Sequence, residues 1–230
     1  MAGHWRCCLI SRPIVFLIFG LIFAFPPVVS AAGEADAVRQ SFHALKAALL
    51  QNQGDEAARL VSRSTLALSE KARDLALYGS KAELEAQPTA MLAAALSLRQ
   101  SIGAQKLRSL PPHDLVAYVV DTNLTRDGPV AGIDLGGVNV NHTNAVANVV
   151  SERPFPVSQL QFAKEGGFWK LDLSDIAYGQ TALDDFVAAL APNNNAVQKS
   201  MRNELILAMI SANTGTGVDG SIWQPPLRRP

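Results

Sequence analysis

The sequence predicts an α+β protein in which N-terminal helices pack on a bent antiparallel sheet of four to five strands, followed by a C-terminal helix. Three observations support this prediction. Residues 34–102 place apolar side chains at helical spacing, whereas residues 130–173 alternate apolar and polar side chains. Glycine pairs interrupt the alternating region twice, as expected for a turn and for a bulge. Apolar residues four apart within 197–209 then predict the final helix.

The region before the predicted sheet contains the signals of several helices. Apolar side chains at i, i+4, i+7 and i+11 predict a first helix over 34–52, which Gly54 is expected to end. Ser80 and Glu83 match a capping box, which marks the start of a later helix. The expected helices are 34–52, a short one from Asp55, 65–78, one from Ser80, and one that contains Met91, Ala95, Leu98 and Ile102.

The sheet is expected to begin after Pro111-Pro112, where the composition changes. Residues 115–122 predict a first strand whose two alternating sets are both mostly apolar, as in a strand covered on both faces. Residues 130–141 predict a second strand, in which Gly136-Gly137 indicates a bulge that bends the sheet. A third strand, 145–151, follows a short turn.

The clearest element is a hairpin over 159–173. Its two alternating runs flank Gly166-Gly167, and glycine is the residue that a two-residue turn favours where φ is positive. With that turn, Phe162 faces Leu171 and the apolar side chains of both strands share one buried face. A turn with an odd number of residues would place the apolar side chains of the two strands on opposite faces of the hairpin. The side chains expected on the buried face are Leu160, Phe162, Trp169, Leu171 and Leu173.

The chain is predicted to form a single domain over 32–212, because no internal repeat divides it. The remaining residues, 213–230, are rich in glycine and proline and predict a flexible tail. Trp223 and Pro225-Pro226 give this tail two further interpretations. It is either an extended segment that docks on a partner or a strap folded over its own domain.

The first 31 residues have the features of an export signal. Arg6 and Arg12 precede an apolar core at 14–25, and Val29-Ser30-Ala31 supplies the small residues of a cleavage site. This core is shorter than the roughly 20 residues that cross a bilayer, which disfavours a retained membrane anchor. We therefore expect cleavage after Ala31, a secreted or periplasmic protein, and no stable membrane anchor after cleavage.

Charge and cysteine content argue against several functions. The chain has 20 basic and 20 acidic residues, and loss of Arg6 and Arg12 with the signal leaves a net charge of −2. So balanced a chain is not expected to bind nucleic acid. Both cysteines, Cys7 and Cys8, lie within the signal, so we expect no disulfide, thiol nucleophile or cysteine metal ligand in the mature chain.

An N-terminal helical group, a bent antiparallel sheet and a last hairpin that reads Lys-Glu-Gly-Gly-Phe-Trp-Lys-Leu-Asp-Leu at 164–173 together resemble the NTF2-like superfamily of cone-shaped α+β folds. The resemblance covers 34–175, although the helical segment before the first strand is long for that pattern. It implies a half-open sheet with a pocket. Members include isomerases and polyketide cyclases that use cavity acids, histidines or tyrosines, and exported domains without assigned chemistry. The fold alone therefore does not decide the activity.

No catalytic motif or metal-ligand spacing occurs in the sequence, so we expect neither a cofactor nor a metal. His43, on the first helix, is interpreted as a cavity base or as a half-exposed helix residue, and His113 and His142 are expected on other elements. Asp134 is the candidate catalytic acid, because neighbouring glycines would let a bent strand turn it inward; the alternative is a solvated strand face. The other candidates by residue type are Tyr118, Asp121, His142, Asp172 and Tyr178.

The first functional hypothesis is an exported binding or accessory domain, without catalysis, that holds a small apolar ligand or a partner protein on the concave sheet face. The alternative is a cofactor-free isomerase or cyclase that uses a cavity acid such as Asp134. A third hypothesis is a homodimer formed through the outer face of the sheet. The cavity lining separates the first two, because an enzyme of this kind needs an inward carboxyl or histidine and a binding domain needs an apolar wall.

Overall fold

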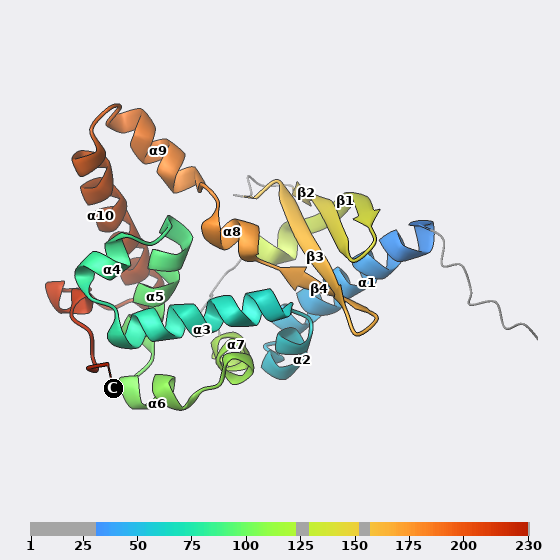
Figure 1. Cartoon of the computed structure of the whole chain (residues 1–230), viewed down its shortest axis with the longest axis horizontal. Coiled ribbons are helices and arrows are strands. Elements are labelled where there is room, and N and C mark those ends of the chain that lie inside the picture. Colours follow the sequence, from blue (N-terminus) through green and yellow to red (C-terminus); the bar gives the residue numbers. More distant parts are fainter. Residues whose placement is uncertain (1–30, 123–128, 152–156, 230) are drawn as a thin grey trace, which may run out of the picture.

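The computed structural model describes residues 31–122, 129–151 and 157–229. In these residues the chain has an α+β fold with one open sheet of four antiparallel strands, in the order β1-β2-β3-β4 (Figure 1). The strands are β1 (Ile133–Asn141), β2 (Asn144–Ser151), β3 (Gln159–Glu165) and β4 (Phe168–Asp172). The predicted fold class is confirmed at this level. The predicted export signal lies outside the described residues, apart from Ala31.

The turn between β3 and β4 sets the register of the last hairpin. Gly166 and Gly167 have φ angles of +58° and +88°, which residues with a Cβ rarely adopt. Phe162 consequently pairs with Leu171, and the register predicted from the sequence is confirmed.

The other glycine pair, Gly136-Gly137, bends β1. The pairing between β1 and β2 shifts between Leu135 and Val138. Strict alternation would place Leu135 and Val138 on opposite faces of the sheet, yet both pack in the same hydrophobic cluster. The bulge inserts one extra residue between them, and the side chain of Val138 therefore returns to the face of Leu135. The predicted bulge is confirmed. The strand itself begins at Ile133, because Pro129–Gly132 forms a 3₁₀ turn.

The seven helices in residues 31–122 precede the sheet. They are α1 (Ala31–Leu50), α2 (Gly54–Arg59), α3 (Arg63–Tyr78), α4 (Lys81–Glu85), α5 (Thr89–Ser101), α6 (Ala104–Ser109) and α7 (Pro112–Asp121). Two predictions are corrected here. Residues 115–122, predicted as a strand, belong to α7 up to Asp121, and Gly54 begins α2 rather than ending α1. Pro112 and Asp114 in the first turn both favour a helix start, and a run that is apolar on both faces suits a buried helix as well as a strand.

Helix α1 packs on the inner face of the sheet. Val38 and Phe42 from α1 are buried in one cluster with residues from all four strands. Trp169 of β4 is 3% exposed, and its indole N–H donates a hydrogen bond of 2.7 Å to the carboxylate of Glu34. The sheet face on which the sequence placed a ligand is therefore occupied by α1.

The outer edge of β4 is joined to the helices. Leu171 donates its backbone N–H to the carbonyl of Leu60 at 2.9 Å and accepts from the N–H of Ser62 at 2.8 Å. The hydroxyl of Thr65, in α3, donates to the carbonyl of Leu171 at 3.2 Å and accepts from the N–H of Leu173 at 2.9 Å. These bonds close an edge that would otherwise expose unpaired backbone groups.

Three helices and a 3₁₀ turn follow the sheet. They are α8 (Ser174–Tyr178), α9 (Ala182–Leu190), α10 (Asn195–Thr214) and η2 (Gly220–Trp223). Helix α10 is the predicted final helix, but its buried apolar side chains are Ile206 and Ile210. Val197 and Met209, which belong to the predicted apolar spacing, are exposed. No helix in the described ranges is long and apolar enough to cross a membrane.

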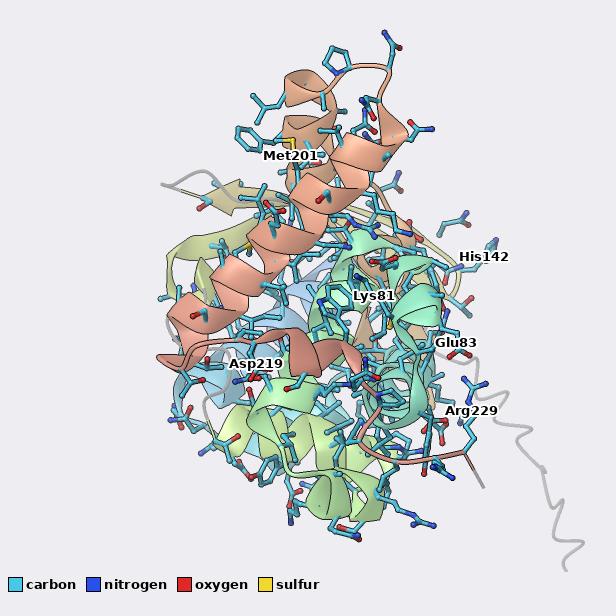
Figure 2. All side chains as sticks on the ribbon, turned by 90° about the vertical axis from the view of Figure 1, so that its left-hand side faces the viewer. Lys81, Glu83, His142, Met201, Asp219 and Arg229 are labelled. Atoms are coloured by element: carbon cyan, nitrogen blue, oxygen red, sulfur yellow. The ribbon has the colours of Figure 1, made fainter. Side chains whose placement is uncertain are left out.

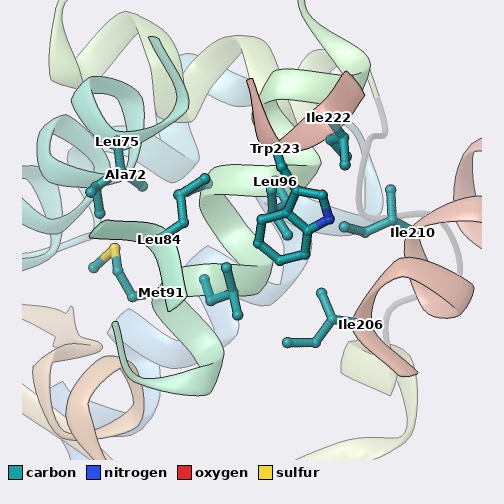
Figure 3. Close-up of a cluster of buried hydrophobic side chains, with 11 residues drawn as sticks. Ala72, Leu75, Leu84, Met91, Leu96, Ile206, Ile210, Ile222 and Trp223 are labelled. Atoms are coloured by element: carbon teal, nitrogen blue, oxygen red, sulfur yellow. The ribbon is translucent and has the colours of Figure 1, made fainter. Parts of the chain in front are cut away.

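A second core lies in the helical half of the molecule, by which we mean α3 to α6, α10 and η2. Figure 3 shows Trp223 from η2 facing Ile206 and Ile210 from α10 within this cluster. The chain end continues along the surface, where Arg229 pairs with Glu83 at 2.8 Å (Figure 2). Of the interpretations that the sequence left for residues 213–230, the contacts of the structure match the strap, because Ile222 and Trp223 pack against Ile206 and Ile210 of α10.

Arg99 of α5 joins the strap to this core. Its guanidinium donates hydrogen bonds of 2.7–2.8 Å to the backbone carbonyls of Leu75, Ala76, Gly79 and Ile222. Burial lowers the pKa of Arg99 to about 10, so the side chain still carries its charge at neutral pH. One side chain thereby connects the end of α3, the following loop and η2.

Candidate functional site

An apolar cavity of about 670 Å³ lies between the β4 edge of the sheet and the surrounding helices. Figure 1 shows this part of the fold, where α3, α7 and α8 lie between the sheet and α5. We call it the central cavity. Its walls come from eight elements and are represented by Leu45 of α1, Leu68 of α3, Leu98 of α5, Val119 of α7, Leu171 of β4 and Ile176 of α8.

Short side chains on α5 leave room for the cavity. Ala90, Ala94, Ser97 and Ser101 are spaced at i, i+4, i+7 and i+11, so they share one face of the helix, and all four line the cavity. Side chains of this size do not reach the apolar residues of α7 across the space. The adjoining α5 residues Met91 and Leu98 also line the cavity and connect it to the packed cores.

The lining described here contains no charged side chain. Its polar side chains are Thr65, Ser69, Ser97, Ser101 and Asn213. Two of them are already engaged by the fold. Thr65 bonds the backbone of β4, and the Ser69 hydroxyl donates to the carbonyl of Leu66 at 2.7 Å. In the described part of the chain, the side chains of Ser97, Ser101 and Asn213 have no hydrogen-bond partner, so a ligand can use them.

Asp134, the candidate acid, does not line this cavity. Its side chain is 61% exposed, and its carboxylate accepts a hydrogen bond of 2.7 Å from the N–H of Leu135. The ring of His43 lies close by, with 3.8 Å between Nε2 and Oδ1, and is 52% exposed. The structure thus brings two candidate residues together, but on an open surface. It matches the solvated strand face that the sequence left as the alternative.

Two other candidate acids hold the ends of helices. Asp121 accepts a hydrogen bond of 2.6 Å from the N–H of Gly54, the first residue of α2. Asp172 accepts one of 2.9 Å from the N–H of Ser174, the first residue of α8. Burial raises the pKa of Asp172, but the hydrogen bonds from Ser174 and nearby serines outweigh it and hold the pKa below its ordinary value. An acid that stays ionised at a helix start is positioned for structure rather than for proton transfer.

The remaining candidates also lie away from the lining. Tyr118 stacks under Lys106, with 5.2 Å from Nζ to the ring centroid. The hydroxyl of Tyr178 accepts a hydrogen bond of 3.3 Å from Lys71. His142 occupies the β1–β2 turn with a φ of +51° and projects from the molecule (Figure 2).

The three histidines of the described chain belong to different elements, as the sequence indicates. His43 is in α1, His113 is in α7 and His142 is in the β1–β2 turn. Within residues 31–122, 129–151 and 157–229, no group of three or more histidines, cysteines and acids is placed to hold a metal ion.

Sequence reasoning did not identify the residues of the central cavity. It interpreted Met91, Ala95, Leu98 and Ile102 as one core-forming face of a helix, and it gave no role to the neighbouring Ala and Ser positions. A face of Ala90, Ala94, Ser97 and Ser101 beside a face of large apolar residues was the available signal. That pattern indicates a cavity only when the positions of the elements that face α5 are known.

Comparison with known proteins found no relative of this chain. No protein-family model, curated protein or solved structure matches the chain. The function must therefore be inferred from the geometry and chemistry of the central cavity.

Proposed function

We propose that this protein is a binding domain that holds a small apolar ligand in the central cavity and does not act on it chemically. The observation that carries the proposal is the lining, in which the described residues are all uncharged around a volume of about 670 Å³. Small-molecule sites typically enclose about 300–1,000 Å³ and combine apolar walls with a few polar groups that orient the ligand. The central cavity has this size and this composition.

The energetics of packing support the same proposal. An apolar wall that faces water lacks packing contacts and forgoes the roughly 25 cal/mol that burial contributes for each Å². Half-buried side chains such as Leu68, Leu98 and Val119 border the space without filling it. An apolar ligand would restore those contacts and remove the exposed wall from water.

The alternative of a cofactor-free isomerase or cyclase requires an acid or a histidine inside the cavity, next to a second polar group. Asp134 lies outside the lining, and the side chains that do line the cavity are apolar residues, hydroxyls and one amide. These groups suit the orientation of a ligand better than the removal of a proton. We therefore place the ligand in the cavity beside β4 rather than on the sheet face.

We propose in addition that the protein is exported and that cleavage after Ala31 yields the mature chain. The basic start and short apolar core of the first 31 residues support this. Glu34, three residues beyond the proposed cleavage site, already bonds Trp169, so the mature chain would keep the described fold. N-terminal sequencing of the exported protein should read from Ala32, and a retained Met1 would contradict the proposal.

Kinship with the NTF2-like group remains part of the same proposal. Its support is the packing of α1 across one face of a bent antiparallel sheet. A site between helices and a sheet edge, in place of one on the sheet face, would be a departure from that pattern.

Binding of N-phenyl-1-naphthylamine, an uncharged fluorophore that brightens in apolar surroundings, tests the proposal. We expect saturable binding of one molecule for each chain. In Ala94→Trp the indole should fill the cavity and weaken binding at least tenfold, and Ala94→Leu should weaken it less. Ala188→Trp, at an exposed position of α9 outside the lining, is the matched control and should leave binding unchanged.

Thermal unfolding of each variant separates loss of binding from loss of fold. The proposal requires that Ala94→Leu and Ala188→Trp unfold at similar temperatures while only Ala94→Leu binds more weakly. Absence of saturable binding to the folded protein contradicts the proposal. So does equal binding by all folded variants.

A further inference from the structure

Three polar side chains of the central cavity, for which the described residues supply no hydrogen-bond partner, come from the adjoining ends of α5 and α10, and Asn213 is exposed there. Ser97 and Ser101 are four residues apart on α5 and therefore lie one above the other. Asn213 reaches the same cavity from the last turn of α10. The hydrogen bond of 3.2 Å from the Gln100 amide to the hydroxyl of Thr216 shows that the ends of α5 and α10 lie together.

Both helices present their C-terminal ends there. Helix α5 ends at Ser101 and α10 ends at Thr214. The last carbonyl groups of a helix carry partial negative charge, which repels an anion and favours a group that donates a hydrogen bond. This end of the cavity is therefore unfavourable for a carboxylate or a phosphate.

Among the described residues, no cation of the lining offsets this field. Arg99 lies on the same stretch of α5, but its guanidinium is engaged by four backbone carbonyls on another side of the helix. The lining equally contains no carboxylate that would pair with a buried ammonium. An anionic head group would meet the negative ends of two helices without a cation in the described lining, and an ammonium would find no carboxylate partner among those residues.

We propose that the ligand is a neutral amphiphile, with an apolar chain against the leucine and valine wall and an uncharged hydroxyl head group at Ser97, Ser101 and Asn213. This inference rests on the proposed function and defines its ligand class. A hydroxyl head group can donate to a serine oxygen or the Asn213 carbonyl oxygen and accept from a serine hydroxyl or the amide. The two serines and the amide thus act as the specificity-determining residues.

Displacement of N-phenyl-1-naphthylamine by three ten-carbon compounds at pH 7.5 tests the inference. Decan-1-ol should displace half of the probe at a concentration at least ten times lower than sodium decanoate or decylamine. In the double variant Ser97→Ala/Ser101→Ala, we expect the alcohol to need an about tenfold higher concentration, since each lost hydrogen bond weakens binding severalfold. The affinity for the probe itself should stay within about twofold.

Ser69→Ala is the matched control, because Ser69 lines the same cavity while its hydroxyl already bonds a backbone carbonyl. This variant should bind decan-1-ol as the parent does. Stronger binding of decanoate or decylamine contradicts the inference, and so does an alcohol preference that survives in the double serine variant, because partitioning alone would then explain it. Failure of the probe to bind the folded parent protein contradicts the proposed function instead.

Discussion

The strands of the sheet half, which consists of α1 and the four strands, are joined by contacts of shorter range than the core of the helical half. In the sheet half, each strand pairs with the next one along the chain, and two of its three connections within the sheet are two-residue turns. In the helical half, the core joins residues as far apart in sequence as Ala72 and Trp223. The four strands are therefore paired with neighbours in sequence and only α1 joins them over a long range, whereas the helical half is complete only when the C-terminal strap arrives.

This difference explains where the cavity lies. Each half has a well-packed cluster with its own buried tryptophan, Trp169 or Trp223. The halves meet along the β4 edge, where Thr65 of α3 and the backbone of residues 60–62, which lead into α3, are hydrogen-bonded to residues 171–173. A junction held by backbone bonds does not require side chains to fill it, and the central cavity occupies that position.

The largest expected effect comes from the core of the sheet half. Phe162 is 2% exposed, and Phe162→Ala should lower the free energy of unfolding by about 3–5 kcal/mol, because it removes a buried ring and leaves a cavity. Denaturant unfolding followed by tryptophan fluorescence measures the change. Phe168→Ala, on the same hairpin but 74% exposed, should change stability by less than about 0.5 kcal/mol. Similar losses in the two variants would contradict the assigned inner face.

The next effect tests the long-range closure of the helical half. Arg99→Met keeps much of the apolar stem but removes one donor from each of four backbone carbonyls, of which that of Leu75 still accepts from the N–H of Gly79, and it should cost about 2–3 kcal/mol. Proteolysis should also cut the strap near Ile222 faster in this variant. Arg108→Met, at an exposed position of α6, serves as the control and should behave as the parent. An unchanged cleavage rate in Arg99→Met would show that the guanidinium does not hold the strap.

A smaller effect is expected at the start of α4, where the predicted capping box is confirmed. The Ser80 hydroxyl accepts from the N–H of Glu83, and the Glu83 carboxylate accepts from the N–H of Ser80. Ser80→Ala should destabilise the protein by about 1 kcal/mol, whereas Ser80→Thr, which retains a capping oxygen, should recover most of the loss. Thermal melting of the pair measures this. Equal melting temperatures for Ala and Thr would exclude a capping role.

The smallest effect is a pH dependence that belongs to the sheet half. Hydrogen bonds from Lys164 and Trp169 lower the pKa of Glu34 below its ordinary value of 4.5. A carboxyl with a lowered folded-state pKa stabilises the fold above the unfolded pKa, and this contribution is lost as the pH falls through the folded pKa. Between neutral pH and about 4.5, Glu34→Gln should therefore be less stable than the parent, and the difference should shrink below pH 4.5. A difference that grows on acidification would reverse the sign of this linkage.

The contrast between the halves also explains what could be predicted from the sequence. The hairpin, the β1 bulge and the α4 cap depend on residues close together in the chain, such as Gly166-Gly167 and Ser80 with Glu83, so their patterns carry the information. Residues 115–122 were predicted wrongly, because a run that is apolar on both faces does not separate a strand from a buried helix. Trp223 was assigned to a flexible tail, because its partners lie in α10 and α5.

The central cavity was the least predictable feature, because it depends on how elements far apart in the sequence pack around it. Small side chains at Ala90 and Ala94 are common on helices, and only the positions of α3, α7 and β4 make them into a wall. Asp134 illustrates the opposite error. Its chemistry suggested a site, but regular alternation between the buried Ile133 and Leu135, before the bulge, leaves the acid at the surface.

Amide hydrogen exchange with and without N-phenyl-1-naphthylamine tests most directly that the ligand site lies at the junction of the two halves. Binding should slow exchange in α5, in α7 and in the segment from Leu171 to Ala177, and it should leave β1 and β2 unchanged. Slower exchange confined to β1 and β2, or no change anywhere upon saturation with the probe, would contradict the assignment of the site to the central cavity.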